Sequence, residues 1–279
     1  MHPATRLREL LNTGETLVMP DAYDPLSARI IEKLGFQAVQ CSGFSMAASC
    51  LCAEAAFGFE RNLAATAGIV RAVRIPVMAD GEDGFGDASM IPDTIDAYLG
   101  AGVAGINIED QVLGAPGPKR LIPLAQAVEK LQAARQAAHD AEVPGFIING
   151  RTDALPAGAT PEEGLGEAIV RANTYLQAGA DLVFVVGVDS LEQVRQLVRE
   201  ITGPLSIAAG MPNNIGNFSV AQLRDAGVAR VSLPSLLICS AIQGMTRSLQ
   251  SVQRTDGFAE IVRDDMACGM AEIMQLLAP

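Results

Sequence analysis

Short apolar runs recur along the chain, and each follows a glycine that comes directly after leucine or alanine. This phrase occupies residues 34–39, 101–106, 178–183 and 226–231. A glycine in that position is typical of a helix C-cap, and the apolar run after it is typical of a strand buried on both faces of a parallel sheet. The pattern therefore predicts repeated helix–strand units of the α/β class.

The spacing of these patterns predicts eight strands with helices between them. The strands are predicted at 16–19, 38–41, 75–79, 104–108, 145–149, 181–186, 204–208 and 229–233. The helices are predicted at 24–34, 60–73, 90–100, 122–140, 161–177, 190–200 and 219–226. Eight such units favour a closed (β/α)8 TIM barrel over an open doubly wound sheet, because open sheets usually have fewer strands and no GxGxxG motif follows the first strand. We expect residues 1–279 to form a single barrel domain.

Two further helical patterns, at 236–249 and 258–277, follow the last predicted strand. The second contains Met266, Met270 and Met274 at a spacing of four residues, which is typical of a packed helix face or a subunit contact. Because the barrel itself needs no such helix pair, we predict that residues 234–279 form a C-terminal helical oligomerisation segment.

Composition and charge argue against several classes of protein. The formal net charge of −12 disfavours a nucleic-acid partner, and no apolar run is long enough to predict a membrane span. The first twelve residues mix polar and apolar side chains, unlike a signal peptide. The five cysteines are odd in number and scattered, which is typical of reduced thiols, so we expect a cytoplasmic protein.

Zinc chemistry is also disfavoured. The chain has only two histidines, so a three-histidine zinc site is excluded. We expect His139, late in a helix, to lie at the surface. Cys50 and Cys52 are too few to hold zinc alone, and we expect them to be buried and inert.

Polar residues directly after the predicted strands are the candidates for chemistry. Asp80 and Glu82 follow the third strand, Glu109 the fourth and Arg151 the fifth, while Glu54 lies in the loop after the second. The ends of barrel strands open at one face, so these side chains are expected to converge. Four carboxylates without histidine indicate a site for Mg²⁺, with Mn²⁺ as the alternative. The guanidinium fork of Arg151 suits a substrate carboxylate or a developing enolate oxygen.

Other polar residues near these strands have simpler interpretations. Asp83 and Asp110 are predicted to cap turns, and Asp153 to orient its loop or pair with an arginine. The loop at 111–122 is rich in glycine and proline and suits a mobile lid. Lys119 and Arg120 in that loop are either a solvated basic pair or groups that close over an anionic substrate.

Five motifs, in order and in register along almost the whole chain, resemble the isocitrate lyase/phosphoenolpyruvate mutase superfamily. They are Asp21–Arg29, Ser42–Gly43, Ala79–Gly86, Gly105–Gln111 and Arg151–Ala154. The resemblance implies a (β/α)8 barrel, a Mg²⁺ cofactor and a terminal helix exchanged between subunits of a dimer that pairs into a tetramer. It also implies cleavage or formation of C–C or P–C bonds next to a 2-oxo acid, through an enolate held on the metal.

The resemblance assigns roles to individual residues. Asp80 would bind the metal directly, Glu82 and Glu109 would hold it mostly through water, and Glu54 would be a further acidic residue of the metal site. Arg151 and Glu109 would be catalytic. The substrate would contact Asp80, Arg151, the backbone amides of the strand-two turn and the aromatic residue of the first motif, that is Tyr23, Ser42, Gly43, Phe44, Asp80 and Arg151.

Departures from the family pattern limit the predicted reaction. Asp80-Gly81-Glu82 replaces the usual Asp-x-Asp, and strand six ends at 184–187 without the usual Glu. The loop at 111–120 has neither the Cys nor the His of the Lys-Arg-Cys-Gly-His motif of isocitrate and methylisocitrate lyases, which argues against those two activities.

We therefore predict a Mg²⁺-dependent C–C bond lyase or decarboxylase that acts on a small anionic 2-oxo or 2-hydroxy (di)carboxylic acid. The alternatives are a P–C bond enzyme, either a phosphonopyruvate mutase or hydrolase, and a 2-oxo-acid-binding homologue with little turnover. A homodimer or homotetramer is expected, with no nucleic-acid or membrane partner.

Overall fold

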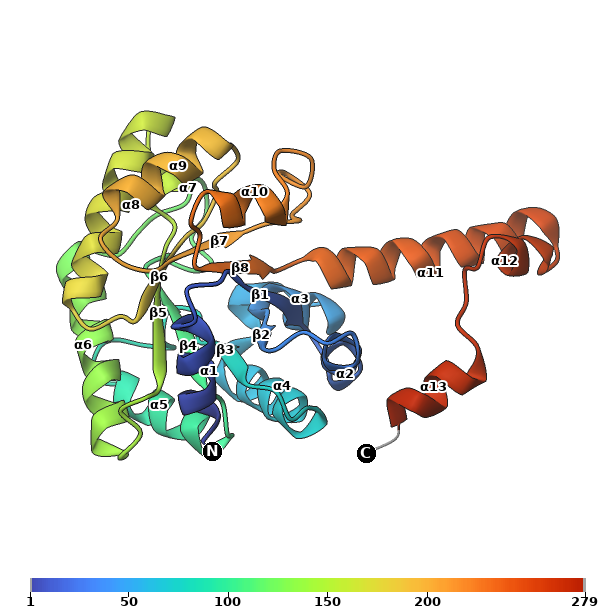
Figure 1. Ribbon diagram of the computed structural model, residues 1–279, viewed down its shortest axis with the longest axis horizontal. Helices are drawn as coiled ribbons and strands as arrows, with labels where there is room; N and C mark the ends of the chain where they lie inside the picture. The colour runs from blue at the N-terminus through green and yellow to red at the C-terminus, as the bar shows by residue number, and fades with distance from the viewer. Residues whose placement is uncertain (1, 278–279) are drawn as a thin grey trace.

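Eight parallel strands close into a barrel in the computed structural model, which describes residues 2–277 (Figure 1). The strands are β1 (Leu17–Ala22), β2 (Val39–Cys41), β3 (Val77–Asp80), β4 (Gly105–Glu109), β5 (Ile147–Thr152), β6 (Leu182–Val185), β7 (Leu205–Ala208) and β8 (Arg230–Leu233). The barrel closes where β1 pairs with β8, with Leu17 opposite Arg230. The predicted (β/α)8 barrel is therefore confirmed, and each predicted strand is present.

The seven predicted barrel helices are also present, within one or two residues of their expected ends. They are α2 (Pro25–Lys33), α4 (Gly58–Ala72), α5 (Ile91–Gly100), α6 (Leu124–Asp140), α8 (Pro161–Gln177), α9 (Leu191–Glu200) and α10 (Val220–Asp225). Several begin at a capping side chain; Asp24 accepts from the Ser27 amide at 2.7 Å, and Thr160 accepts from the Glu163 amide at 3.2 Å. Such caps satisfy amides that have no partner within the helix and so fix where it begins.

Four short helical segments were not expected from the sequence. They are α1 (Pro3–Leu11), α3 (Gly43–Ser49), the 3-10 turn η1 (Glu54–Ala56) and α7 (Ala154–Ala157). Two of them, α3 and α7, follow β2 and β5 directly at the carboxyl end of the barrel, and η1 comes after α3 in the same connection. They therefore shape the face at which a barrel enzyme places its chemistry.

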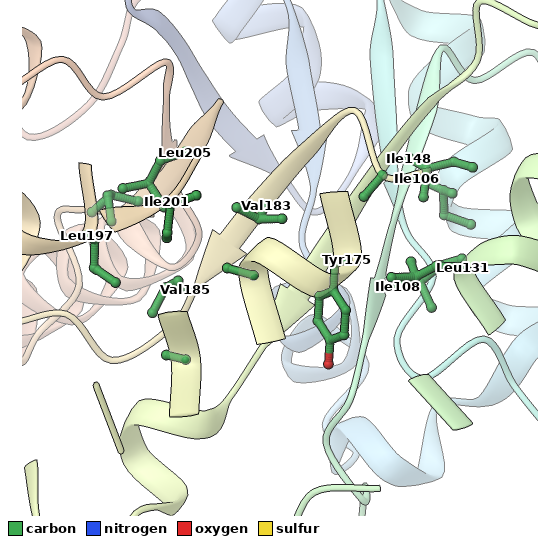
Figure 2. Close-up of a cluster of buried hydrophobic side chains, with 14 of the residues drawn as sticks. Ile106, Ile108, Leu131, Ile148, Tyr175, Val183, Val185, Leu197, Ile201 and Leu205 are labelled. Carbon is green, nitrogen blue, oxygen red and sulfur yellow. The ribbon is translucent and has the colours of Figure 1, made fainter. Parts of the chain in front are cut away.

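The main hydrophobic core lies between the strands and the surrounding helices. Figure 2 shows Ile108 of β4 close to Leu131 of α6 and Leu205 of β7 close to Leu197 of α9, all of them almost fully buried. Burying an aliphatic side chain of this size contributes about 1.5–3 kcal/mol. The core thus fixes the strand ends that carry the polar side chains.

The inside of the barrel is polar. Arg230 is fully buried on β8, donates to Gln40 Oε1 at 2.8 Å and lies with its guanidinium carbon 5.7 Å from the centre of the Phe184 ring. Burial lowers its pKa to about 10, while the nearby Asp21 carboxylate opposes this shift. This polar layer lies inside the barrel beneath the residues at its carboxyl end.

The C-terminal helices extend away from the barrel (Figure 1). Helix α11 (Leu236–Thr255) is longer than predicted and projects outward, and α12 (Ala259–Arg263) and α13 (Met270–Leu277) follow it. The predicted continuous helix at 258–277 is wrong, because the chain turns between α12 and α13, where Asp265 adopts a left-handed φ of 50°. Met266 therefore lies outside any helix. Among the described helices, none combines the length and the apolar character that crossing a membrane would require.

Candidate active site

A cavity of about 350 Å³ opens at the carboxyl ends of the strands. Of the predicted site residues, Ser42, Phe44, Glu54, Asp80 and Arg151 line it. Tyr23, Gly43, Glu82 and Glu109 lie outside its lining, although the last three contact residues that line it. Tyr23 instead packs against the apolar cluster around α2 and β2, so its contact with substrate stays a prediction.

Asp80 is held by the first turn of α3. The Gly43 amide donates to Asp80 Oδ2 at 2.9 Å, and a Cβ atom on Gly43 would lie 3.1 Å from that oxygen and 3.3 Å from Glu54 Oε1. Glycine thus allows the helix to approach both carboxylates closely. The hydroxyl of Ser42 accepts from the Ser45 amide at 3.2 Å and caps the helix.

The three amides predicted to bind a substrate carboxylate differ in their availability. The Ser42 amide donates to the Ala22 carbonyl at 3.1 Å, and the Gly43 amide is occupied by Asp80. Within residues 2–277, the Phe44 amide donates no hydrogen bond. Of the three predicted amides, only that of Phe44 is therefore available to a ligand.

Glu82 lies behind Asp80 in a strained, buried position. Its φ is 47°, and Asn62 Nδ2 donates both to Glu82 Oε1 at 3.0 Å and to the Asp80 carbonyl at 3.1 Å. The Tyr98 hydroxyl in turn donates to Asn62 Oδ1 at 2.8 Å. Burial, and then the charge of Asp80, raise the pKa of Glu82 to about 8. Asn62 and Tyr98 were not predicted. No signal in the sequence singles them out, because the inner face of each helix carries a second polar residue, Thr66 on α4 and Thr94 on α5.

Arg151 is fixed between two carboxylates. Its Nη1 lies 2.6 Å from Glu109 Oε2, and its Nε lies 2.9 Å from Asp153 Oδ2, so the predicted pairing of Asp153 with an arginine is confirmed. Burial disfavours the charge of Arg151, but Asp153 and Glu109 outweigh this effect and raise its pKa. Lys119, from the loop at 111–122, also bonds to Asp153 and lines the cavity.

Asp110 differs from its predicted role as a turn cap. It is buried and accepts hydrogen bonds from Thr152 Oγ1 at 2.6 Å, the Asp153 amide at 2.9 Å and the Tyr175 hydroxyl at 2.6 Å, and Arg171 pairs with it at 3.2 Å. It thereby joins β4 to the end of β5 and orients the segment that carries Asp153. By contrast, Asp83 is a turn residue as predicted, since it accepts from the Phe85 amide at 2.9 Å.

The cysteines also depart from expectation. Cys50 is exposed and Cys52 is half-buried, so the prediction that both are buried is wrong; both lie at the surface end of α3, in the turn that leads to η1. Cys239, on the first turn of α11, lines the cavity, which the sequence did not indicate. His139 is largely exposed, as predicted.

The charges around the cavity fit a divalent cation. Asp21, Glu54 and Asp80 line it with only Lys119 and Arg151 as cations, and burial together with the charge of Asp80 raises the pKa of Glu54. Within residues 2–277, no three acidic, histidine or cysteine side chains converge into a ready cage. Mg²⁺ suits this arrangement, because it is usually held by one or two carboxylates and keeps several waters.

A (β/α)8 barrel whose mouth gathers carboxylates beside a fixed arginine is typical of an enzyme that acts on a small anion. The chain belongs to the phosphoenolpyruvate phosphomutase family, whose family model matches residues 7–253. It is an enzyme of the isocitrate lyase/phosphoenolpyruvate mutase superfamily, and its close homologues are carbon–carbon lyases.

Three comparisons illustrate this membership. The chain is 35% identical over 211 residues to 2,3-dimethylmalate lyase of Eubacterium barkeri, covering 73% of this chain and 70% of that protein. It is 34% identical over 223 residues to oxaloacetate decarboxylase of Pseudomonas putida strain GB-1, covering 77% of this chain and 74% of that protein. Among solved structures, phosphonopyruvate hydrolase in complex with oxalate and Mg²⁺ superposes with a TM-score of 0.87 at 26% identity, covering 99% of this chain and 95% of that one.

Proposed function

We propose that this enzyme cleaves a C–C bond in a small 2-oxo or 2-hydroxy dicarboxylic acid. The observation that supports the proposal is the placement of Arg151 and Asp80 on the lining of one cavity, with Glu109 paired to Arg151 and Glu54 close to Asp80. This arrangement stabilises negative charge that develops on a substrate oxygen, which is the main barrier to forming an enolate.

Each group at the cavity would have a distinct task. Asp80, supported by Glu54, Glu82 and Glu109, would hold Mg²⁺, which when bound supplies an electrophile for the substrate oxygens. The Phe44 amide would donate to the substrate carboxylate. The Arg151 guanidinium, held by Glu109 and Asp153, would donate to the 2-oxo oxygen as its charge increases. Because its fork is already oriented, little reorganisation is needed during the reaction.

Protonation of the product carbon needs a group other than the cysteine that the loop at 111–122 lacks. Lys119 is the residue of that loop whose ammonium bonds to Asp153 beside Arg151 at the cavity. We propose that Lys119 Nζ delivers the proton to the carbon released by C–C cleavage. In decarboxylation of an oxaloacetate-like acid, the C3–C4 bond would break, CO2 would leave, and carbon 3 of the enolate would take this proton. In aldol-type cleavage of a 2-hydroxy acid, the 2-hydroxyl proton would pass to a cavity carboxylate such as Glu54 as the C2–C3 bond breaks, and the released enolate carbon would take the proton from Lys119.

The test is an assay of the purified protein with Mg²⁺ against oxaloacetate, 2,3-dimethylmalate, 2-methylisocitrate and phosphonopyruvate. Pyruvate is followed with a coupled dehydrogenase, and spontaneous decay is subtracted with enzyme-free blanks. We expect turnover of at least one C–C substrate and loss of that turnover in excess EDTA. Turnover of phosphonopyruvate alone would replace the proposal with the P–C alternative, and absence of turnover would favour the binding homologue.

Asp80→Ala separates metal-dependent chemistry from a structural role. We expect its turnover to fall by a factor of about 10²–10³, as loss of a main electrostatic stabiliser typically produces. Asp83→Ala is the matched control, because Asp83 is a turn carboxylate of the same loop that does not line the cavity. Near-normal activity in Asp80→Ala would remove this residue from the reaction.

We also propose that residues 234–279 mediate assembly into a homodimer or homotetramer. The support is the exposure of large apolar side chains along the described part of this segment, including Ile242, Met245, Leu249, Met270 and Met274. Large exposed apolar side chains in such number are typical of an interface. Light scattering after size exclusion tests the proposal; a monomer at micromolar concentration would contradict it.

The expected cytoplasmic location stays a prediction.

A further inference from the structure

The charged residues that line the cavity all lie on one side of it. Asp21 and Asp80 come from β1 and β3, Arg151 from β5, and Glu54 and Lys119 from the loops after β2 and β4. The ends of β6, β7 and β8 and the segments that follow them contribute no charged side chain to the lining. The cavity is therefore divided into a charged half and an uncharged half.

The uncharged half is lined by a wall of apolar residues, which we call the distal wall. It consists of Phe184, Val186, Ala208, Met211, Pro212 and Pro234. Ser235 and Cys239 complete the lining after β8, and both are polar but uncharged. The nearest cation on this side of the barrel, Arg230, is fully buried and lies beneath the Phe184 ring, outside the cavity lining. Arg230 is also already hydrogen-bonded to Gln40, so it offers no direct contact to a charged group at the distal wall.

The two halves set different requirements for a substrate. The charged half, with Arg151, Lys119 and the carboxylates that would hold a cation, suits the 2-oxo acid and a second carboxylate near Lys119. The distal wall suits a group without charge, because an unpaired carboxylate placed against apolar side chains loses its hydration without compensation. Ala208, the smallest side chain of the wall, is buried at the end of β7 and leaves room there.

We propose that the substrate carries an alkyl substituent on carbon 3 and that this substituent occupies the distal wall. The inference rests on the proposed function and narrows it to alkyl-substituted C4 diacids of the 2-oxo or 2-hydroxy class. Acids with a carboxymethyl group at the same position, which are tricarboxylates, are disfavoured. The distal wall is thus the specificity-determining part of the cavity.

The test compares kcat/KM for a matched series of acids with hydrogen, methyl, ethyl and carboxymethyl on carbon 3. Each added methylene is expected to raise kcat/KM by about fourfold, the factor that corresponds to burying one methylene. The carboxymethyl acid is expected to be about 100-fold or more below the ethyl acid. A flat series, or a preference for the carboxymethyl acid, would overturn the inference while leaving the proposed C–C cleavage intact.

Met211→Arg places a cation at the distal wall, at a half-buried position of the loop after β7. The ethyl-to-carboxymethyl ratio of kcat/KM should fall by about tenfold or more in this variant. Ile215→Arg is the matched control, because Ile215 lies in the same loop, is 62% exposed and does not line the cavity. Equal ratios in the two variants would contradict the assignment of Met211 to the distal wall.

A second readout keeps the inference testable if no acid is turned over, which would count against the proposed function alone. Binding of the same four acids is then measured with Mg²⁺ by thermal shift and calorimetry. The ethyl acid should bind more tightly than the unsubstituted acid, and the carboxymethyl acid more weakly than either. The reverse order would refute the distal wall as an alkyl site.

Discussion

Replacing Asn62 with alanine tests how the acidic loop after β3 is held in place. Asn62 is fully buried on α4 and connects four groups: the Glu82 carboxyl, the Asp80 carbonyl and the hydroxyls of Tyr98 and Thr66. Asn62→Ala removes two hydrogen bonds to the loop and leaves the Tyr98 hydroxyl without its acceptor. Lost neutral hydrogen bonds cost about 0.5–1.5 kcal/mol each, and an unsatisfied buried group costs about 1–3 kcal/mol.

The free energy of unfolding of Asn62→Ala should therefore fall by about 3 kcal/mol, measured by urea denaturation at pH 7. Tyr98→Phe is the smaller perturbation, since it removes only the hydroxyl, and should cost about 1 kcal/mol. The double variant should cost less than the two single changes together, because removing the hydroxyl relieves the group that Asn62→Ala leaves unsatisfied.

Repeating the measurement on Asn62→Ala with Mg²⁺ adds a second test. With its pKa raised to about 8, Glu82 is largely protonated at pH 7, and a bound cation would favour its ionised form. The hydrogen bond from Asn62 then goes to a charged acceptor and is worth more, so Asn62→Ala should lose more stability with Mg²⁺ than without it. A loss below about 1 kcal/mol, or strictly additive costs for the pair, would refute the view that Asn62 anchors this loop.

Three further predictions concern other residues of the site. Arg151→Lys keeps the charge but cannot bridge Glu109 and Asp153, so kcat should fall by about 10²; an unchanged rate would make Arg151 purely structural. Burial raises the pKa of Asp21 from 3.8 to about 7, so its contribution to stability is complete below pH 4 and is lost as the pH rises toward 7. In Asp21→Asn, the free energy of unfolding measured with urea should therefore change less between pH 5 and 8 than in the wild type. Parallel pH profiles for the two proteins would contradict this. Gly81→Ala would place a Cβ atom 2.6 Å from the Asn107 carbonyl and from the Ile106 side chain. The free energy of unfolding, measured by thermal or urea denaturation, should therefore fall by about 1–3 kcal/mol. Wild-type stability in this variant would show that the loop can shift.

The barrel was predictable from the sequence because its strands are buried on both faces. Strands of this kind appear as continuous apolar runs, and β2, β4, β6 and β8 each follow a glycine at the end of a helix, such as Gly102 and Gly227 with φ of 88° and 91°. Before these four strands, local chemistry therefore marks both the end of the helix and the start of the strand. The short segments α3, η1 and α7 escaped prediction because fewer than about two turns carry no readable periodicity.

The sequence predicted where the site lies better than it predicted the hydrogen bonds that hold its residues in place. Asp80 and Arg151 line the cavity as the strand ends implied, since the topology alone brings them together. The partners that hold the site are distant in sequence; Tyr98 reaches Asn62 across 36 residues and Tyr175 reaches Asp110 across 65. Side-chain contacts of that range depend on packing between helices, which hydrophobic spacing does not encode. For the same reason the broken helix after α12 depends on Asp265, whose left-handed conformation leaves no periodic signal.

Closure of the barrel through β1 and β8 has a consequence for synthesis of the chain. Asp21 accepts hydrogen bonds from Ser232 and Leu233, 211 and 212 residues later, and β1 has no partner on that side until β8 exists. At a translation rate of about 5–20 residues per second, β1 remains an open strand edge on the ribosome for roughly 10–40 s. An unpaired edge is a template for pairing with other chains. The nascent chain should therefore depend on a ribosome-associated chaperone that covers residues 17–22 until the last strand emerges.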